Sequence, residues 1–221
     1  SVYNHLRPFL IVFAVTMLLV CFSVTIRQAA IWKNSVVLFG HAVAKNPDNY
    51  LAHYLYGQAL YEKKRFAEAT REFNLATAAK IDFAQAYRQL GLSLAAQGRF
   101  DDALRAYDRA GHYGLWNADL HLLRGNSLLG AGNFGQAVAA YNRALSLQPW
   151  RADIHNNLGL ALTKMGRLNE ARDSFQQAAQ IQPTNPSVRN NLAMILFMQG
   201  DNEGAISHFR EALRLAPNFA N

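Results

Sequence analysis

The chain has 221 residues, of which 51% are hydrophobic and 17% charged, and its formal net charge is +7. This composition excludes an intrinsically disordered chain, because such chains have too little apolar surface to bury. The basic residues are spread thinly and form no stripe of the kind that nucleic-acid binding requires. The single cysteine, Cys21, cannot form an internal disulfide. We therefore predict a folded protein that does not bind nucleic acid.

An apolar segment near the N-terminus predicts a membrane helix. Residues 9–26 read FLIVFAVTMLLVCFSVTI, without a charge, a glycine or a proline, and they lie between Arg7 and Arg27. As a helix this run would span roughly 27 Å, close to the apolar thickness of a bilayer. A signal peptide or a buried helix is the alternative, but no small-residue cleavage pattern follows the run. We predict a transmembrane helix with its flanks over residues 1–28, contacting the lipid bilayer through residues 9–26.

The next segment, residues 29–49, looks like half of a repeat. Phe39, Ala42 and Pro47 occupy the aromatic, small and terminal proline places of a 34-residue pattern that continues through the rest of the chain. A helix with this pattern would present a matching apolar surface to the first complete repeat. We predict a degenerate half-repeat that caps the array at its N-terminal end.

From Tyr50 the sequence repeats every 34 residues, five times, without an insertion or a deletion. The eighth place of each unit is small: Gly57, Gly91, Gly125, Gly159 and Ala193. The twenty-fourth place is aromatic: Phe73, Tyr107, Tyr141, Phe175 and Phe209. Such a period is typical of stacked pairs of helices. We predict an all-α solenoid over residues 50–217, with units at 50–83, 84–117, 118–151, 152–185 and 186–219.

Within each unit the pattern predicts two helices that pack closely together. The first should end at a residue in the left-handed conformation, which is glycine in four units and Lys64 in the first. Small residues at the eighth and twentieth places should let the two helices approach each other. We expect the aromatic at the twenty-fourth place to fill the space against the following unit.

These positions resemble the tetratricopeptide repeat, and the resemblance covers Tyr50 to Pro217. It implies a right-handed superhelix of helix–turn–helix units that binds proteins or peptides. The junction between Trp32 and Asn49 is similar to that of multi-pass membrane proteins with a glycosyltransferase-C-type, O-mannosyltransferase-like domain and a C-terminal array of this kind. That similarity implies that the chain is the last membrane helix and the array of a larger protein. It also places the repeats on the periplasmic or lumenal side, whereas the basic residues after the span favour the cytoplasm.

The resemblance also implies a peptide-binding groove lined by the first helices of the units. Asparagine amides there can both donate hydrogen bonds to a peptide backbone and accept them from it. Asparagine at the sixth place is also common in such repeats as local structural support, so this second interpretation stays open. The implied groove residues are Tyr54, Gln58, Tyr61, Arg88, Gln89, Asn126, Asn156, Asn157, Asn190 and Asn191.

No group of residues predicts catalysis or metal binding. His53, His121 and His155 recur at the fourth place, but repeats stack roughly 10 Å apart, which is too far for neighbouring imidazoles to share a metal. We interpret these histidines as packing residues and predict neither a metal, a cofactor nor a catalytic set. The chain is therefore predicted to be a membrane-anchored binding scaffold and not itself an enzyme. It would recruit a partner to a larger glycosyltransferase-like protein, or alternatively serve as a single-span assembly factor of a secretion, pilus or envelope complex.

Overall fold

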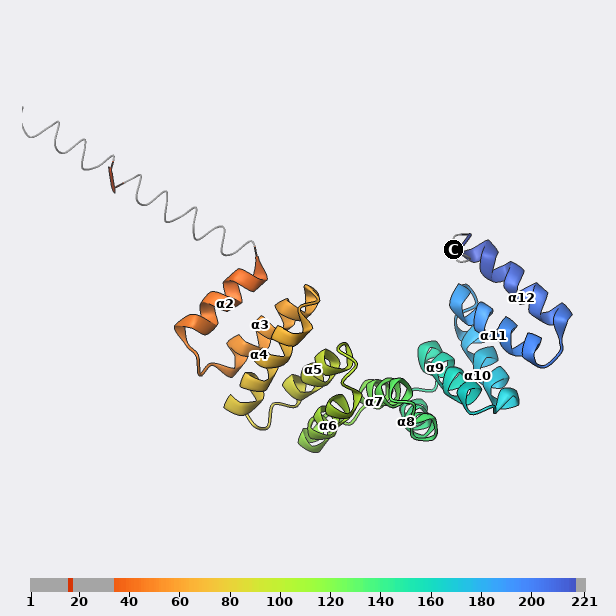
Figure 1. Cartoon of the computed structure of the whole chain (residues 1–221), viewed down its shortest axis with the longest axis horizontal. Helices are drawn as coiled ribbons and strands as arrows, with labels where there is room; N and C mark the ends of the chain where they lie inside the picture. The colour runs from red at the N-terminus through yellow and green to blue at the C-terminus, as the bar shows by residue number, and fades with distance from the viewer. Residues whose placement is uncertain (1–15, 18–33, 218–221) are drawn as a thin grey trace, which may run out of the picture. The chain divides into compact units, whose positions relative to one another are not determined.

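The computed structural model describes residues 16, 17 and 34–217, and this part of the chain is built from helices joined by short turns (Figure 1). The chain divides into two compact units, residues 1–80 and residues 81–221. None of the helices within the described residues combines the length and apolar character needed to cross a bilayer. The predicted span at residues 9–26 lies outside the described residues except for 16 and 17.

The first compact unit contains three described helices, α2 (Ser35–Lys45), α3 (Tyr50–Glu62) and α4 (Phe66–Ala79). Asparagine side chains begin two of them: Asn34 Oδ1 accepts from Val36 N, and Asn49 Oδ1 accepts from Leu51 N and Ala52 N. Such caps satisfy backbone N–H groups that lack a partner within the helix. Helix α2 packs on α3, and α3 packs on α4. The half-repeat segment thus supplies one helix against the first complete helix pair.

The second compact unit contains four helix pairs in which each helix packs on the next. The second helix of each pair contacts the first helix of the following pair, and the first helices also contact one another in order. A short π-helical segment, η1 (Gly111–Leu115), separates the first two pairs. The helices are α5 (Ala84–Ala95), α6 (Phe100–Ala110), α7 (Ala118–Gly130), α8 (Phe134–Leu147), α9 (Ala152–Lys164), α10 (Leu168–Ile181), α11 (Pro186–Met198) and α12 (Asn202–Leu215).

In four of the described helix pairs, from α3/α4 to α9/α10, the core contains an aromatic ring seated on a glycine. A Cβ atom added to Gly125 would lie 2.5 Å from the Tyr141 ring, and one added to Gly159 would lie 2.7 Å from the Phe175 ring. Both rings are almost completely buried. The structure places this ring against the small residue of its own unit, a contact that the sequence pattern did not identify. The glycine is needed because the ring occupies the volume that any side chain would take.

The turn within each helix pair depends on one residue in the left-handed conformation. Lys64 has φ 59° in the first pair, and glycines take the same place in the others. The backbone N–H of the following residue, such as Arg65, donates to a carbonyl of the first helix, here Leu60 O at 2.9 Å. A left-handed residue is the usual end of an α-helix because it lets the chain reverse while these carbonyls stay satisfied. The equivalent glycines are Gly98, Gly132, Gly166 and Gly200.

Candidate functional site

All ten residues predicted to line the groove lie on the first helices of their pairs. Tyr54, Gln58 and Tyr61 lie on α3 in the first compact unit, and the other seven lie on four helices of the second unit: Arg88 and Gln89 on α5, Asn126 on α7, Asn156 and Asn157 on α9, and Asn190 and Asn191 on α11. Because α5, α7, α9 and α11 contact one another in order, their side chains can share one face of the second unit.

Four of the five asparagines form a continuous hydrogen-bonded chain, which we call the asparagine row (Asn126, Asn156, Asn157 and Asn191). The Asn191 amide donates to Asn156 Oδ1 at 2.9 Å. Asn156 donates to Asn157 Oδ1 at 3.3 Å, and Asn157 donates to Asn126 Oδ1 at 2.9 Å. The row therefore crosses from α11 over α9 to α7, so that one line of amides joins three successive helix pairs.

The row is tied to the apolar core at its Asn126 end. The phenol of Tyr141, on α8, donates to Asn126 Oδ1 at 2.9 Å. Tyr141 is fully buried, and this burial raises the pKa of its phenol far above the ordinary value. Its hydroxyl therefore stays protonated and keeps donating. The aromatic place of this unit thus fixes one end of the row as well as filling the core.

The row retains hydrogen-bonding capacity after its internal bonds are made. Each side-chain amide has two N–H donors and a carbonyl acceptor. Asn156, Asn157 and Asn191 each donate only one N–H among the described residues, and the Oδ1 atom of Asn191 accepts none there. These groups could bind the alternating N–H and C=O groups of an extended peptide backbone. The row could therefore hold a chain without reading its side chains.

The remaining predicted residues do not join the row. On α3, Gln58 donates to the Tyr54 hydroxyl at 3.0 Å, and the ring of Tyr61 lies edge-on to Phe66 at 5.2 Å. These side chains support their own helix pair. Arg88 and Gln89 are half-buried on α5, and their side chains make no hydrogen bond or ion pair within the described part of the chain. Asn190 contacts the Met194 sulfur at 3.8 Å, at the edge of the row.

An exposed apolar patch at the C-terminal end of α11 was not predicted. It consists of Met194, Phe197 and Met198, which are 50%, 65% and 54% exposed. They occupy the ninth, twelfth and thirteenth places of the fifth unit, and the ninth and twelfth places of the first unit are the predicted groove residues Gln58 and Tyr61. The repeat positions of these three residues could therefore have predicted the patch from the sequence. The asparagine row ends beside it, since Asn190 contacts Met194.

Residues at the fourth place act as ties between a helix and the turn before it. Their side chains lie within hydrogen-bonding distance of the carbonyl oxygen of the proline six residues earlier: His53 to Pro47 at 2.7 Å, His155 to Pro149 at 3.0 Å and Arg189 to Pro183 at 3.2 Å. The prediction of a packing role therefore missed a polar one. His121 has no proline at that distance and instead stacks on Trp116, with ring centroids 4.9 Å apart.

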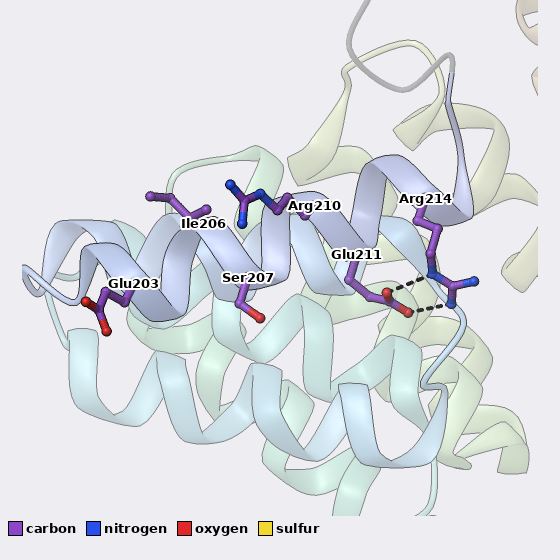
Figure 2. A pocket seen from close by; sticks show the side chains of 6 residues that line it. All are labelled: Glu203, Ile206, Ser207, Arg210, Glu211 and Arg214. Carbon is purple, nitrogen blue, oxygen red and sulfur yellow. Dashed lines mark hydrogen bonds and ion pairs between the residues drawn. The ribbon is translucent and has the colours of Figure 1, made fainter.

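A hollow lies along one face of α12 and is lined by residues of that helix alone (Figure 2). Its volume is about 470 Å³. The Arg214 guanidinium donates two hydrogen bonds to the Glu211 carboxylate, at 2.8 and 2.9 Å. No acid, base and nucleophile are brought together here. The lining residues are Glu203, Ile206, Ser207, Arg210, Glu211 and Arg214.

Comparison with known sequences and structures identifies the repeat. Family models of the tetratricopeptide repeat match residues 38–82 and 122–186, residues 162–221, and residues 84–109. A search of curated proteins found no matching sequence.

Solved structures of tetratricopeptide proteins share the fold at low sequence identity. YrrB, described as a TPR protein with an unusual peptide-binding site, is 19% identical over 82% of this chain and 94% of its own, with a TM-score of 0.66. MamA from Desulfovibrio magneticus RS-1 is 18% identical over 78% of this chain and 97% of its own, with a TM-score of 0.72. TTC0263 from Thermus thermophilus is 20% identical over 78% of this chain and 94% of its own, with a TM-score of 0.60.

Proposed function

Because this chain belongs to the tetratricopeptide repeat family, we propose that it is a binding scaffold that holds an extended peptide segment of a partner protein along the asparagine row. The observation that carries the proposal is the continuous row of amides across α7, α9 and α11, with donors and an acceptor left over. The description of YrrB as having a peptide-binding site supports this use of the fold.

The geometry of the row also suggests the length of the peptide. Packed helices lie about 8–10 Å apart, so three successive first helices span roughly 20 Å. An extended chain rises about 3.3 Å per residue, so roughly six residues would cover the row. Recognition through backbone groups would tolerate many side chains along that stretch. The apolar patch beside Asn190 would favour a peptide with a bulky apolar residue at one end.

Peptides selected from a random twelve-residue phage-displayed library on the full chain provide a direct test. We expect the double variant Asn157→Ala with Asn191→Ala to weaken binding of the selected peptides by about 100-fold, because about 1.4 kcal/mol is lost for each amide. Isothermal titration calorimetry measures the change. Asn142→Ala is the matched control, since Asn142 is exposed on α8 and outside the row, and its affinity should equal that of the parent.

The opposite outcome would favour the structural interpretation of the row. Within the row the amides also hold α7, α9 and α11 together. If the double variant melts at a lower temperature but binds the selected peptides as tightly as the parent does, then the row only supports the stack, and the peptide lies elsewhere.

We further propose that the scaffold is attached to a membrane through residues 9–26, where it recruits its partner to a glycosyltransferase-like protein. The apolar run and the similarity of the junction sequence support this proposal. Replacing Leu18 and Leu19 together by arginine should cost several kcal/mol of insertion free energy, roughly 3 per residue. We expect the parent chain to stay with membranes after carbonate extraction and the double variant to be released. Equal release of both proteins would overturn the attachment.

A further inference from the structure

A hollow between α7 and α8 is lined by residues that are not part of the asparagine row. It has a volume of about 340 Å³. Its floor is formed by the buried side chains of Leu128 and Ala140, and two guanidinium groups, those of Arg124 and Arg143, line it. His121 lines the same hollow, together with Gln136 and Ala139 at the exposed rim.

The imidazole of His121 presents a buried nitrogen to this region without a partner. Among the described residues, His121 Nδ1 has no hydrogen bond, although the atom is buried. Burying a polar atom without a partner is costly, so such an atom needs an explanation, such as a bound water, ion or ligand that satisfies it. Trp116 holds the ring in place by stacking on it at 4.9 Å. Burial, Arg124 and Arg143 together lower the pKa of His121.

The same two places of the first repeat show what would satisfy this histidine. There His53, at the fourth place, has its Nδ1 atom 2.7 Å from Oε2 of Glu72, which is at the twenty-third place. In the third repeat the fourth place is again histidine, His121, but the twenty-third is Ala140. The third repeat therefore keeps the imidazole and lacks the carboxylate that pairs with it in the first.

The charges around the hollow favour an acidic ligand. Arg124 and Arg143 each contribute a positive charge, and Arg143 has no ion pair among the described residues. The opposing charge is that of Asp108 on α6, whose Oδ1 atom lies 3.0 Å from Arg124 Nε without forming a well-directed hydrogen bond. The balance is one net positive charge, which a single carboxylate would neutralise. A carboxylate can also accept two parallel hydrogen bonds from a guanidinium.

We propose that this hollow binds the side-chain carboxylate of a glutamate or aspartate on a partner protein, supplying from outside the group that Glu72 supplies within the first repeat. The methylene groups of such a side chain would lie on the apolar floor, and the carboxylate would face His121 and the two arginines. The partner is thus bound at a face formed by α7 and α8, through side-chain chemistry that the asparagine row does not use.

The test is an NMR titration of the full chain with N-acetyl-glutamate N-methylamide, using the ring signals of His121 and the indole signal of Trp116. Capped glutamine is the matched probe, since it differs only in replacing the carboxylate by an amide. We expect a saturable response to capped glutamate with an affinity about tenfold higher than for capped glutamine, because charge-assisted hydrogen bonds are about twice as strong as neutral ones. An equal response to both probes, or no response, would overturn the proposal. Tighter binding of inorganic phosphate than of capped glutamate at equal ionic strength would also overturn the assignment to an acidic side chain.

Three variants test whether the NMR response arises in this hollow. Arg143→Gln should weaken the capped-glutamate affinity by about tenfold through loss of a charged donor, whereas Arg210→Gln removes the same charge from α12 and should change nothing. Ala140→Glu should supply the carboxylate internally, as in the first repeat, so that its His121 signals match those of the ligand-bound parent and no longer respond to the probe. If Ala140→Glu fails to fold, the comparison of Arg143→Gln with Arg210→Gln decides: equal affinities would contradict the site.

Discussion

Phe175→Ala is expected to lower the free energy of unfolding by about 3–5 kcal/mol, the range for truncating a buried aromatic residue. The Phe175 ring is 1% exposed and fills the space over Gly159, which itself has no side chain to relax into the resulting cavity. Both the lost burial and the remaining cavity contribute to the cost. Urea unfolding of the full chain under identical conditions, followed by circular dichroism, measures the difference.

Phe209→Ala is the matched control for this prediction. Phe209 occupies the same place in the fifth repeat, but it is only half-buried, and the eighth place of that repeat is Ala193 instead of a glycine. We therefore expect a clearly smaller loss for Phe209→Ala than for Phe175→Ala. If both variants lost the same free energy of unfolding, burial of the ring would not determine how much the aromatic residue stabilises its repeat. That result would contradict our account of the core.

The helical fold could be predicted from the sequence because it depends on residues that recur in register. The small residue at the eighth place, the aromatic at the twenty-fourth and the left-handed residue in the turn each serve a local geometric need. The neighbour of the aromatic ring could not be predicted in the same way. Spacing shows that a small and a large residue recur, but only coordinates show that the Phe175 ring lies over Gly159.

The residues of the candidate site could be predicted from the sequence, but the hydrogen bonds between them could not. Asn156 and Asn157 are among the predicted groove residues, yet a periodic sequence cannot show that their amides bond to Asn126 and Asn191 on neighbouring helices. The histidines at the fourth place illustrate the same limit. His53 and His121 are equivalent in the pattern, yet His53 pairs with Glu72 and the Pro47 carbonyl, whereas His121 stacks on Trp116 and its Nδ1 atom has no partner among the described residues.

Gly125→Ala is expected to destabilise the chain by about 1–3 kcal/mol, the cost of overpacking a filled core. The new Cβ atom would lie 2.5 Å from the Tyr141 ring. That ring is fully buried and its hydroxyl is held by Asn126, so it has little freedom to move away. Movement of the ring would also disturb the bond that fixes one end of the asparagine row. We therefore expect weaker binding of the selected peptides together with the loss of stability.

Gly135→Ala separates this steric effect from the general preference of helices for alanine. Gly135 lies in α8, in the same helix pair, and a Cβ atom added there would have nothing within 4 Å. Alanine is favoured over glycine within a helix by up to about 1 kcal/mol, so this variant should be at least as stable as the parent and bind peptides equally well. Thermal melting and the peptide titration compare the two variants. If Gly125→Ala proved as stable as Gly135→Ala, the ring would have room to move, and the close approach of α7 and α8 would not be the reason for glycine at the eighth place.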